Sequence, residues 1–145
     1  MDTVAALVLA AGKGTRMKSG LVKVLHPLAG RPMIDWPVEA ARDAGASRVV
    51  LVVGHQAVTV QEYFAGQNEV AFAVQAEQLG TGHAVACAQD LLKGRGGRIL
   101  ILCGDVPLIR PETLKGMLAQ HEARQAAVTV LTTHLAKPYG YGRVV

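Results

Sequence analysis

The sequence contains few aromatic residues and few cysteines. Phe, Trp and Tyr make up 4% of the 145 residues, although 50% of the chain is apolar. We therefore expect a core of Val, Leu, Ile and Ala, which is typical of a sheet covered by helices. The two cysteines, Cys87 and Cys103, form no C-x-x-C pair and have no metal-ligand spacing. The sequence thus predicts reduced thiols and a cytoplasmic location.

The chain also lacks a strong charge of one sign and any long apolar run. Its formal net charge is +4, without a lysine-rich run or interleaved aromatic residues. This pattern favours anionic small molecules over nucleic acid as partners. The first apolar run, residues 4–9, is too short for a signal peptide or a membrane span, and Lys13 and Arg16 follow it. We expect no nucleic-acid partner, no export and no membrane insertion.

The stretch after this first run is rich in glycine and carries positive charge. Residues 4–9 have the β-branched content of a buried strand, and Gly12 and Gly14 follow it closely. Small residues leave the backbone N–H groups uncovered, while Lys13 and Arg16 supply charge. The pattern predicts a loop that holds a polyphosphate chain. An ordinary strand-to-helix turn with incidental glycines is the alternative.

Two better-known phosphate loops do not fit this stretch. A P-loop requires a Gly-Lys pair followed by Ser or Thr, whereas Lys13 precedes Gly14. The dinucleotide fingerprint requires a third small residue where Met17 stands. It also requires an acidic residue after the second strand, where Gly54 begins a Gly-His-Gln sequence. A phosphate loop of a different type is therefore indicated.

Apolar runs alternate with helical patterns along the chain. Strands are expected at residues 4–9, 48–53, 70–74, 98–102 and 127–132. Helices are expected at residues 32–44, 57–64, 84–92 and 111–124, and an extended connection at residues 18–29. This alternation predicts an α/β, Rossmann-like fold, a mostly parallel sheet with helices on both faces. Ligands then bind at the carboxyl ends of the strands.

Asp105 lies just beyond the strand expected at residues 98–102. A carboxylate in this position can hold Mg²⁺ against phosphate oxygens, because Mg²⁺ commonly uses one or two carboxylates together with substrate phosphates. The alternative is an Asx-turn or a helix cap. A phosphate loop on another strand favours the magnesium hypothesis.

A polar loop with two glutamines follows the strand expected at residues 70–74. Gln75 and Gln78 offer paired donors and acceptors that match the edge of a nucleobase, and Gly80 lets backbone amides approach as well. The alternative is a polar loop that simply starts a helix. We interpret His83 as a helix-start residue, because no nucleophile pairs with it in the sequence.

Five motifs together resemble one bacterial family. They are LAAGKGTRM at residues 9–17, KVLHPLAGRPM at 23–33, QAEQLGTGHA at 75–84, GDVPLI at 104–109 and YGRV at 141–144. In this order they resemble the nucleotidyltransferase domain of the N-acetylglucosamine-1-phosphate uridyltransferases, bifunctional enzymes that make UDP-N-acetylglucosamine. The resemblance covers the chain and implies a fold of the nucleotide-diphospho-sugar transferase type.

The resemblance also implies a reaction and a set of site residues. UTP and N-acetylglucosamine 1-phosphate would give UDP-N-acetylglucosamine and pyrophosphate, with Mg²⁺ as cofactor, in cell-wall precursor synthesis. Arg16 and Lys23 would act in catalysis, and Asp105 would bind the metal. The residues implied in substrate binding are Leu9, Ala10, Ala11, Gly12, Gly14, Lys23, Gln75, Gln78, Gly80, Thr81, Cys103, Gly104, Asp105 and Gly142.

The sequence departs from this family in two places and differs in length. Val22 stands where the family usually has proline, and Cys103 where tyrosine is frequent. The family's domain continues beyond Val145 and supplies a second metal ligand there, so residues 1–145 are expected to be its amino-terminal part. We expect the acetyltransferase β-helix domain to be absent and full-length members to form homotrimers. A CTP- or GTP-using nucleotidyltransferase, or a nucleotide-binding fragment without turnover, is the alternative.

Overall fold

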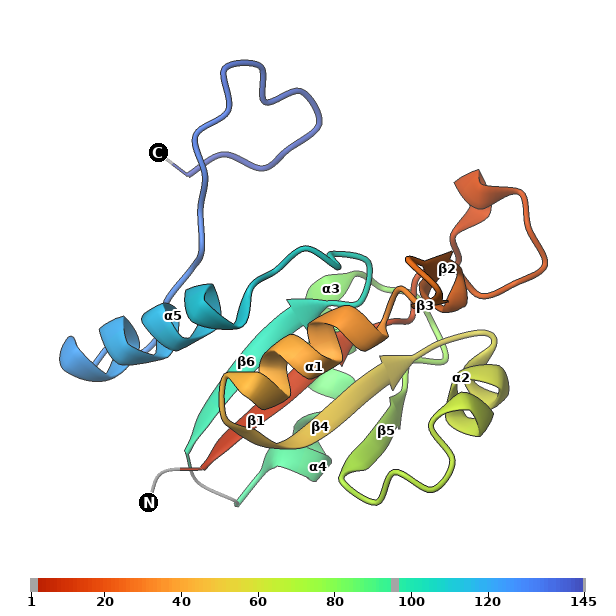
Figure 1. Ribbon diagram of the computed structural model, residues 1–145, viewed down its shortest axis with the longest axis horizontal. Coiled ribbons are helices and arrows are strands. Elements are labelled where there is room, and N and C mark those ends of the chain that lie inside the picture. The colour runs from red at the N-terminus through yellow and green to blue at the C-terminus, as the bar shows by residue number, and fades with distance from the viewer. Residues whose placement is uncertain (1–2, 95–96, 145) are drawn as a thin grey trace.

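A four-stranded sheet forms the centre of the computed structural model, which describes residues 3–94 and 97–144 (Figure 1). The strands are β1 (Val4–Leu9), β4 (Ala46–Val53), β5 (Val70–Val74) and β6 (Arg98–Cys103). They pair in parallel in the order β5-β4-β1-β6. The carboxyl ends of all four strands therefore lie at one edge of the sheet.

The two central strands are buried on both of their faces. Leu7 of β1 lies between Val50 of β4 and Ile101 of β6 in the register of the sheet. The side chains of Leu7 and Leu51 are fully buried, at 0% exposure. Burial on both faces explains why these strands are continuous apolar runs and do not alternate.

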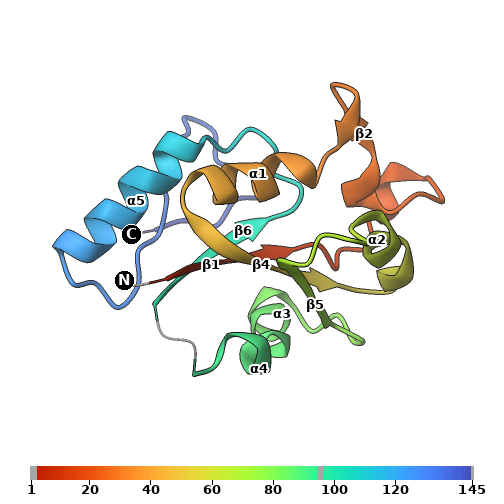
Figure 2. The same cartoon turned by 60° about the horizontal axis from the view of Figure 1, so that its bottom comes forward.

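Helices cover both faces of the sheet (Figure 2). One face carries α1 (Asp35–Asp43) and α5 (Pro111–Ala123), and the other carries α3 (Thr81–Cys87) and α4 (Gln89–Leu92). α2 (Ala57–Tyr63) places Val60 in the same buried cluster as α1. The expected α/β fold is thus confirmed. In residues 3–94 and 97–144, no helix is both long enough and apolar enough for a membrane span.

A short hairpin occupies the place where the first helix was expected to begin. β2 (Pro27–Leu28) pairs antiparallel with β3 (Arg31–Pro32), and Ala29 and Gly30 turn the chain with φ angles of 51° and 87°. The helix predicted from Pro32 therefore starts only at Asp35. The predicted helix start at Pro32 is wrong because this residue belongs to strand β3 of the hairpin.

The connection predicted as extended at residues 18–29 is partly folded. It includes η2 (Lys23–Leu25), a 3-10 turn in which Val24 and Leu25 are buried. The Ile34 amide donates to the Val24 carbonyl at 2.9 Å, which ties this turn to the segment before α1. A second 3-10 turn, η1 (Thr15–Met17), follows the glycine-rich loop. The buried side chains of Val24 and Leu25 thus fix the connection at residues 18–29 to the core, although its sequence has no periodic apolar pattern.

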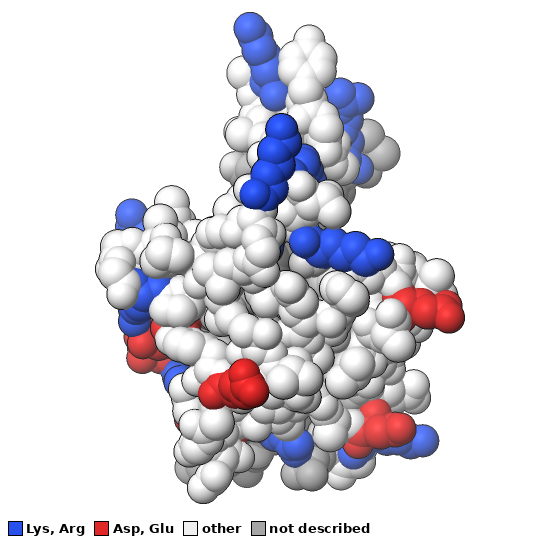
Figure 3. Space-filling model, turned by 90° about the vertical axis from the view of Figure 1, so that its right-hand side faces the viewer, with Lys and Arg blue, Asp and Glu red and all other residues white. Residues whose placement is uncertain are grey.

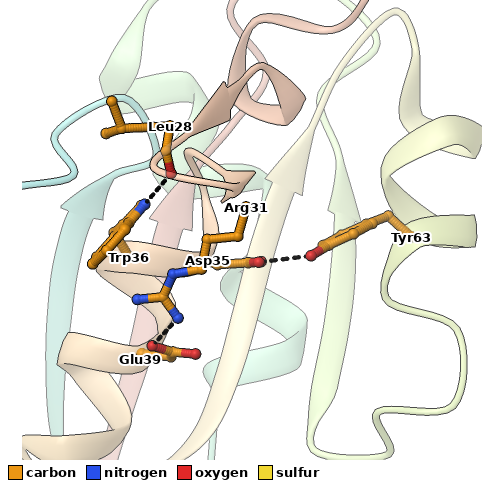
Figure 4. A network of polar contacts seen from close by, with 6 residues as sticks. All are labelled: Leu28, Arg31, Asp35, Trp36, Glu39 and Tyr63. Carbon is orange, nitrogen blue, oxygen red and sulfur yellow. Dashed lines mark hydrogen bonds and ion pairs between the residues drawn. The ribbon is translucent and has the colours of Figure 1, made fainter.

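Polar contacts attach the hairpin to α1 (Figure 4). The Arg31 guanidinium stacks over the Trp36 ring, 3.7 Å from its centroid, and forms an ion pair with Glu39. The Trp36 indole N–H donates to the Leu28 carbonyl at 3.3 Å. Because both strands of the hairpin contact α1, the chain segment before the helix has a fixed direction.

A side-chain hydrogen bond connects α1 to α2. The Tyr63 hydroxyl donates to the Asp35 carboxylate at 2.6 Å (Figure 4). Partial burial, followed by the hydrogen bond and the charge of Asp35, raises the pKa of Tyr63 to about 12. The phenol is therefore held in its neutral form.

The remaining elements differ from the predictions chiefly in their bounds. The helix predicted at residues 84–92 begins at Thr81 and is divided at Ala88 into α3 and α4. The strand predicted at residues 48–53 begins at Ala46, and β6 extends to Cys103. The helix predicted at residues 111–124 corresponds to α5.

The strand predicted at residues 127–132 is wrong. Residues 126–144 contain neither helix nor strand and extend away from the sheet in Figure 1. Val128 and Val130 are 76% and 69% exposed, so their apolar pattern meets no neighbouring strand on which to pack. Val145 lies outside the described residues.

Candidate functional site

A cleft of about 830 Å³ opens at the carboxyl edge of the sheet. It lies where the chain leaves β1, β5 and β6, as expected for a parallel sheet. A pocket of this size suits a small-molecule ligand or cofactor. The cleft is lined by Leu9, Ala10, Ala11, Gly12, Lys13, Gly14, Thr15, Arg16, Met17, Lys23, Val24, Gln75, Gln78, Gly80, Thr81, Ala84, Cys103 and Asp105.

The glycine-rich loop is held by close backbone packing. The Ala10 amide donates to the Val52 carbonyl at 2.8 Å. A side-chain carbon at residue 54 would lie 2.6 Å from the Ala11 carbonyl oxygen, so this approach requires glycine. At Gly14, where φ is +60°, such a carbon would lie 2.7 Å from the Lys23 Cβ atom. The loop therefore has a defined path, and Gly14 admits Lys23 beside it.

Figure 3 draws a face of the molecule on which several Lys and Arg side chains are visible. Lys and Arg side chains occupy the upper part of that face, and the acidic side chains visible there lie lower. Lys13, Arg16 and Lys23 all line the cleft. Cationic side chains beside uncovered backbone amides form an environment that attracts phosphate.

Lys23 and Asp105 meet across the cleft although 82 positions separate them in the sequence. The Lys23 ammonium lies 2.5 Å from a carboxylate oxygen of Asp105, and the two side chains are 30% and 40% exposed. The Gly104 amide donates to the Leu9 carbonyl at 2.9 Å, which fixes the turn that carries Asp105. The carboxylate thus pairs with a cleft lysine rather than capping a helix.

The residues around Asp105 fit a hard divalent cation that is shared with a ligand. Within residues 3–94 and 97–144, no three His, Cys, Asp or Glu side chains form a metal-binding group. A single carboxylate suits Mg²⁺, which takes its remaining ligands from phosphate oxygens and water. The site has the donor for a metal–phosphate complex but does not form an all-protein metal cage.

Cys103, at the end of β6, has a perturbed thiol. Partial burial of the sulfur raises its pKa, the nearby Asp105 carboxylate raises it further, and Lys23 opposes the shift. The thiol is therefore mostly protonated at neutral pH. It contributes a small, mostly uncharged surface to the cleft.

The glutamine loop closes the cleft on the side of β5. Gln75 is 3% exposed, and its backbone amide donates to the Val53 carbonyl at 2.8 Å. The Gln78 side-chain amide donates to the Ala11 carbonyl, so it joins this loop to the glycine-rich loop. Gly80 has a φ angle of +99°, a conformation that favours glycine, and its carbonyl accepts the first hydrogen bond of α3.

The cleft brings together most of the residues proposed from the sequence. Gly104 lies behind the cleft wall, where a side-chain carbon would be 3.0 Å from the Leu9 carbonyl oxygen. Gly142 lies in the segment 126–144 and does not line the cleft. Val24 and Ala84 line the cleft but were not expected, because apolar side chains next to functional positions carry no distinctive signal in the sequence.

These features define an α/β domain with a basic cleft at the carboxyl edge of a parallel sheet. Residues 6–143 match the MobA-like NTP transferase domain. The chain belongs to this family of nucleotidyltransferases, so its class is that of a transferase.

Comparisons with individual proteins agree with the family. The chain is 70% identical over 145 residues to the bifunctional protein GlmU of Geobacter metallireducens, and spans 30% of the length of that relative. A UDP-glucose pyrophosphorylase complexed with UDP-glucose shares the fold, with a TM-score of 0.70 at 23% identity over 86% of this chain and 55% of that one. Rv0371c of Mycobacterium tuberculosis, in complex with manganese, gives a TM-score of 0.68 at 24% identity over 83% and 60%.

Proposed function

We propose that the chain binds UTP with Mg²⁺ and takes part in uridylyl transfer to N-acetylglucosamine 1-phosphate. The products are UDP-N-acetylglucosamine, a precursor for cell-wall synthesis, and pyrophosphate. Membership of the nucleotidyltransferase family and the high identity to GlmU support this proposal. The single observation that carries it is the Lys23–Asp105 pair, which lies in one cleft with the glycine-rich loop.

In this reaction an oxygen of the sugar 1-phosphate attacks the α-phosphorus of UTP. The bond from that phosphorus to the bridging oxygen of the β-phosphate breaks, and pyrophosphate leaves. Two anionic groups must approach each other, so the main requirements are charge neutralisation and alignment. Arg16, Lys23 and the uncovered amides of residues 11–14 meet the first requirement because they line the same cleft.

Asp105 would hold the Mg²⁺ ion, which supplies additional positive charge to the phosphates when bound. Lys23 forms an ion pair with the same carboxylate. The Gln75 and Gln78 side chains then face the remaining part of the cleft, where we place the base. Gly142 is proposed to lie near the amino sugar on the basis of the family resemblance alone. Residues 1–145 are proposed to supply the nucleotide-holding part of a larger transferase.

Titration calorimetry of UTP with and without Mg²⁺ tests this proposal. The wild-type chain should bind UTP more tightly with Mg²⁺. In Asp105→Asn the enhancement should fall by about 10- to 100-fold, because a charged ligand worth about 1.5–3 kcal/mol is lost. Asp43→Asn, at the end of α1 and far from the cleft, is the matched control and should behave as wild type. An undiminished magnesium enhancement in Asp105→Asn would contradict the metal assignment.

Pyrophosphate release distinguishes turnover from binding alone. The assay combines the chain with Mg²⁺, N-acetylglucosamine 1-phosphate and each of UTP, CTP and GTP. Release with UTP alone supports the proposed reaction. Release with CTP or GTP instead would assign another nucleotide, and UTP binding without release would assign a nucleotide-binding role to residues 1–145.

A further inference from the structure

His83 lies directly against the buried side chain of Gln75. Its Nδ1 atom is 3.1 Å from the Gln75 Nε2 atom. The same Nε2 atom lies 3.0 Å from the Gly80 carbonyl oxygen. His83 is on α3, one turn before Cys87, whose sulfur is 3.8 Å from the His83 Nε2 atom. These contacts connect Gln75, which lines the cleft, to His83 and Cys87 on α3.

The chemistry of these groups fixes the orientation of the Gln75 amide. A carbonyl oxygen can only accept hydrogen bonds, so the group that faces Gly80 must be the NH₂ of Gln75. Its second proton points to His83, which makes Nδ1 of His83 the acceptor. The proton of a neutral His83 is then on Nε2, directed toward the Cys87 sulfur.

With both amide protons engaged, Gln75 can offer a ligand only its carbonyl oxygen. Gln75 lines the cleft, and within the described residues no group donates a hydrogen bond to its Oε1 atom. An acceptor in this position complements N3 of uracil, which carries a proton. It opposes N3 of cytosine, which is itself an acceptor.

We propose that His83 is a positioning residue that makes the cleft selective for uracil over cytosine, by holding the Gln75 amide with its oxygen toward the base. This inference rests on the proposed function, in which Gln75 contacts the base. The Gly80 carbonyl has two lone pairs, so it accepts from the Ala84 amide at 3.1 Å and also from one amide proton of Gln75. The contact with His83 engages the second amide proton, and the two contacts together hold the amide plane with its oxygen toward the cleft.

The test compares the affinities for UTP and CTP in a pair of variants. His83→Leu removes the acceptor, whereas His83→Asn keeps an oxygen near the position of Nδ1. The ratio of the two affinities is the readout, because a loss of fold would weaken both nucleotides alike. We expect His83→Leu to lower the UTP preference roughly tenfold and His83→Asn to retain most of it. His121 lies on α5, and its Nδ1 atom makes a similar 3.0 Å contact to the Thr129 hydroxyl. His121→Leu removes that contact and should leave the ratio unchanged.

Several outcomes would overturn the inference, and they differ from failure of the proposed function. An unchanged ratio in His83→Leu would make His83 a purely structural residue. An equal loss of preference in both His83 variants would show that the acceptor does not set selectivity. If wild type fails to bind UTP or binds UTP and CTP equally, the proposed function itself is wrong, and the variants are not needed to show it.

The wild-type protein provides a second measurement that does not depend on how the variants fold. Nitrogen-15 NMR of the histidine rings reports which ring nitrogen carries the proton. We expect His83 to be protonated on Nε2 and to show a hydrogen-bond coupling between its Nδ1 and a side-chain amide proton of Gln75. A proton on Nδ1 in the neutral ring would contradict the proposed orientation.

Discussion

The central strands and the segment 126–144 contain similar apolar residues in opposite environments. Leu51 in β4 is fully buried between two neighbouring strands, whereas Leu131 is 52% exposed and has no strand beside it. The loops that follow β1, β5 and β6 line the cleft, and Gly142 in the exposed segment does not. Positions that are fixed by neighbouring strands can hold a ligand with little loss of entropy.

Each cleft loop is tied to the adjacent strand by one short backbone hydrogen bond. Ala10 donates to Val52, Gln75 donates to Val53, and Gly104 donates to Leu9. In this way the sheet fixes three loops that are far apart in the sequence. The segment after α5 has a turn-closing bond from Tyr141 to Pro138 but no such bond to the sheet among the described residues.

The largest expected difference between the two regions is in stability. Leu51→Ala should lower the free energy of unfolding by about 2–5 kcal/mol, because it opens a cavity in a fully buried core. Leu131→Ala should change it by no more than about 0.5 kcal/mol. Urea unfolding followed by circular dichroism measures both. A large loss in Leu131→Ala would mean that the segment 126–144 packs on the core in solution.

A second difference concerns UTP binding and compares two exposed arginines, Arg16 in the cleft and Arg143 outside it. Arg16→Ala should weaken UTP binding by about 10- to 100-fold, as a charged hydrogen bond worth about 1.5–3 kcal/mol is lost, and should barely affect uridine. Arg143→Ala, in the segment outside the cleft, is the matched control and should leave both ligands unchanged. Calorimetry with UTP and uridine gives the comparison. Equal losses for UTP and uridine in Arg16→Ala would assign Arg16 to the fold.

The two cysteines should differ in how their alkylation responds to nucleotide. The raised pKa of Cys103 keeps it protonated, so its reaction with iodoacetamide should increase only at a pH above that needed for a free thiol. UTP with Mg²⁺ should slow the reaction at Cys103, which lines the cleft, and have little effect at Cys87. Mass spectrometry of the labelled peptides separates the two sites. Protection of Cys87 alone would place the nucleotide elsewhere.

The smallest effect is expected at Tyr63, far from the cleft. Its pKa is raised to about 12, so the neutral phenol is favoured by folding. The neutral Tyr63 phenol therefore contributes its full stabilisation below about pH 10, which is the ordinary pKa of tyrosine. This contribution is lost as the pH rises toward 12. Tyr63→Phe should be less stable than wild type by under about 1 kcal/mol at pH 8.

The difference between wild type and Tyr63→Phe should shrink at high pH. Urea unfolding at pH 8 and at pH 11 measures it in each protein. A difference that is the same at both values would show that the Asp35 hydrogen bond does not hold the phenol in its neutral form.

Local patterns predicted the glycine-rich loop, the four strands of the sheet and the place of Asp105. Each depends on residues close together in the sequence, such as an apolar run followed by Gly12 and Gly14. The Lys23–Asp105 pair could not be predicted, because it joins positions 82 residues apart. The hairpin was missed because Pro32 also suits the first turn of a helix.

The wrong strand at residues 127–132 has a physical explanation as well. Apolar β-branched residues such as Val128 and Val130 are compatible with a strand, but a strand also needs a partner for its backbone groups. In the described residues, the segment after α5 finds none. The β-propensity of its residues shows that a segment can form a strand. Pairing with a neighbouring strand determines whether the strand forms.

An NMR titration of the nitrogen-15-labelled chain with UTP and Mg²⁺ tests the central claim most directly. If the carboxyl edge of the sheet holds the nucleotide, the largest shifts will occur at the amides of Gly12, Gly14 and Gly80. The amides of residues 126–144 will move little, and Mg²⁺ alone will reproduce only the changes near Asp105. Shifts concentrated in residues 126–144, with the glycine-rich loop unchanged, would contradict the assignment of this cleft as the nucleotide site.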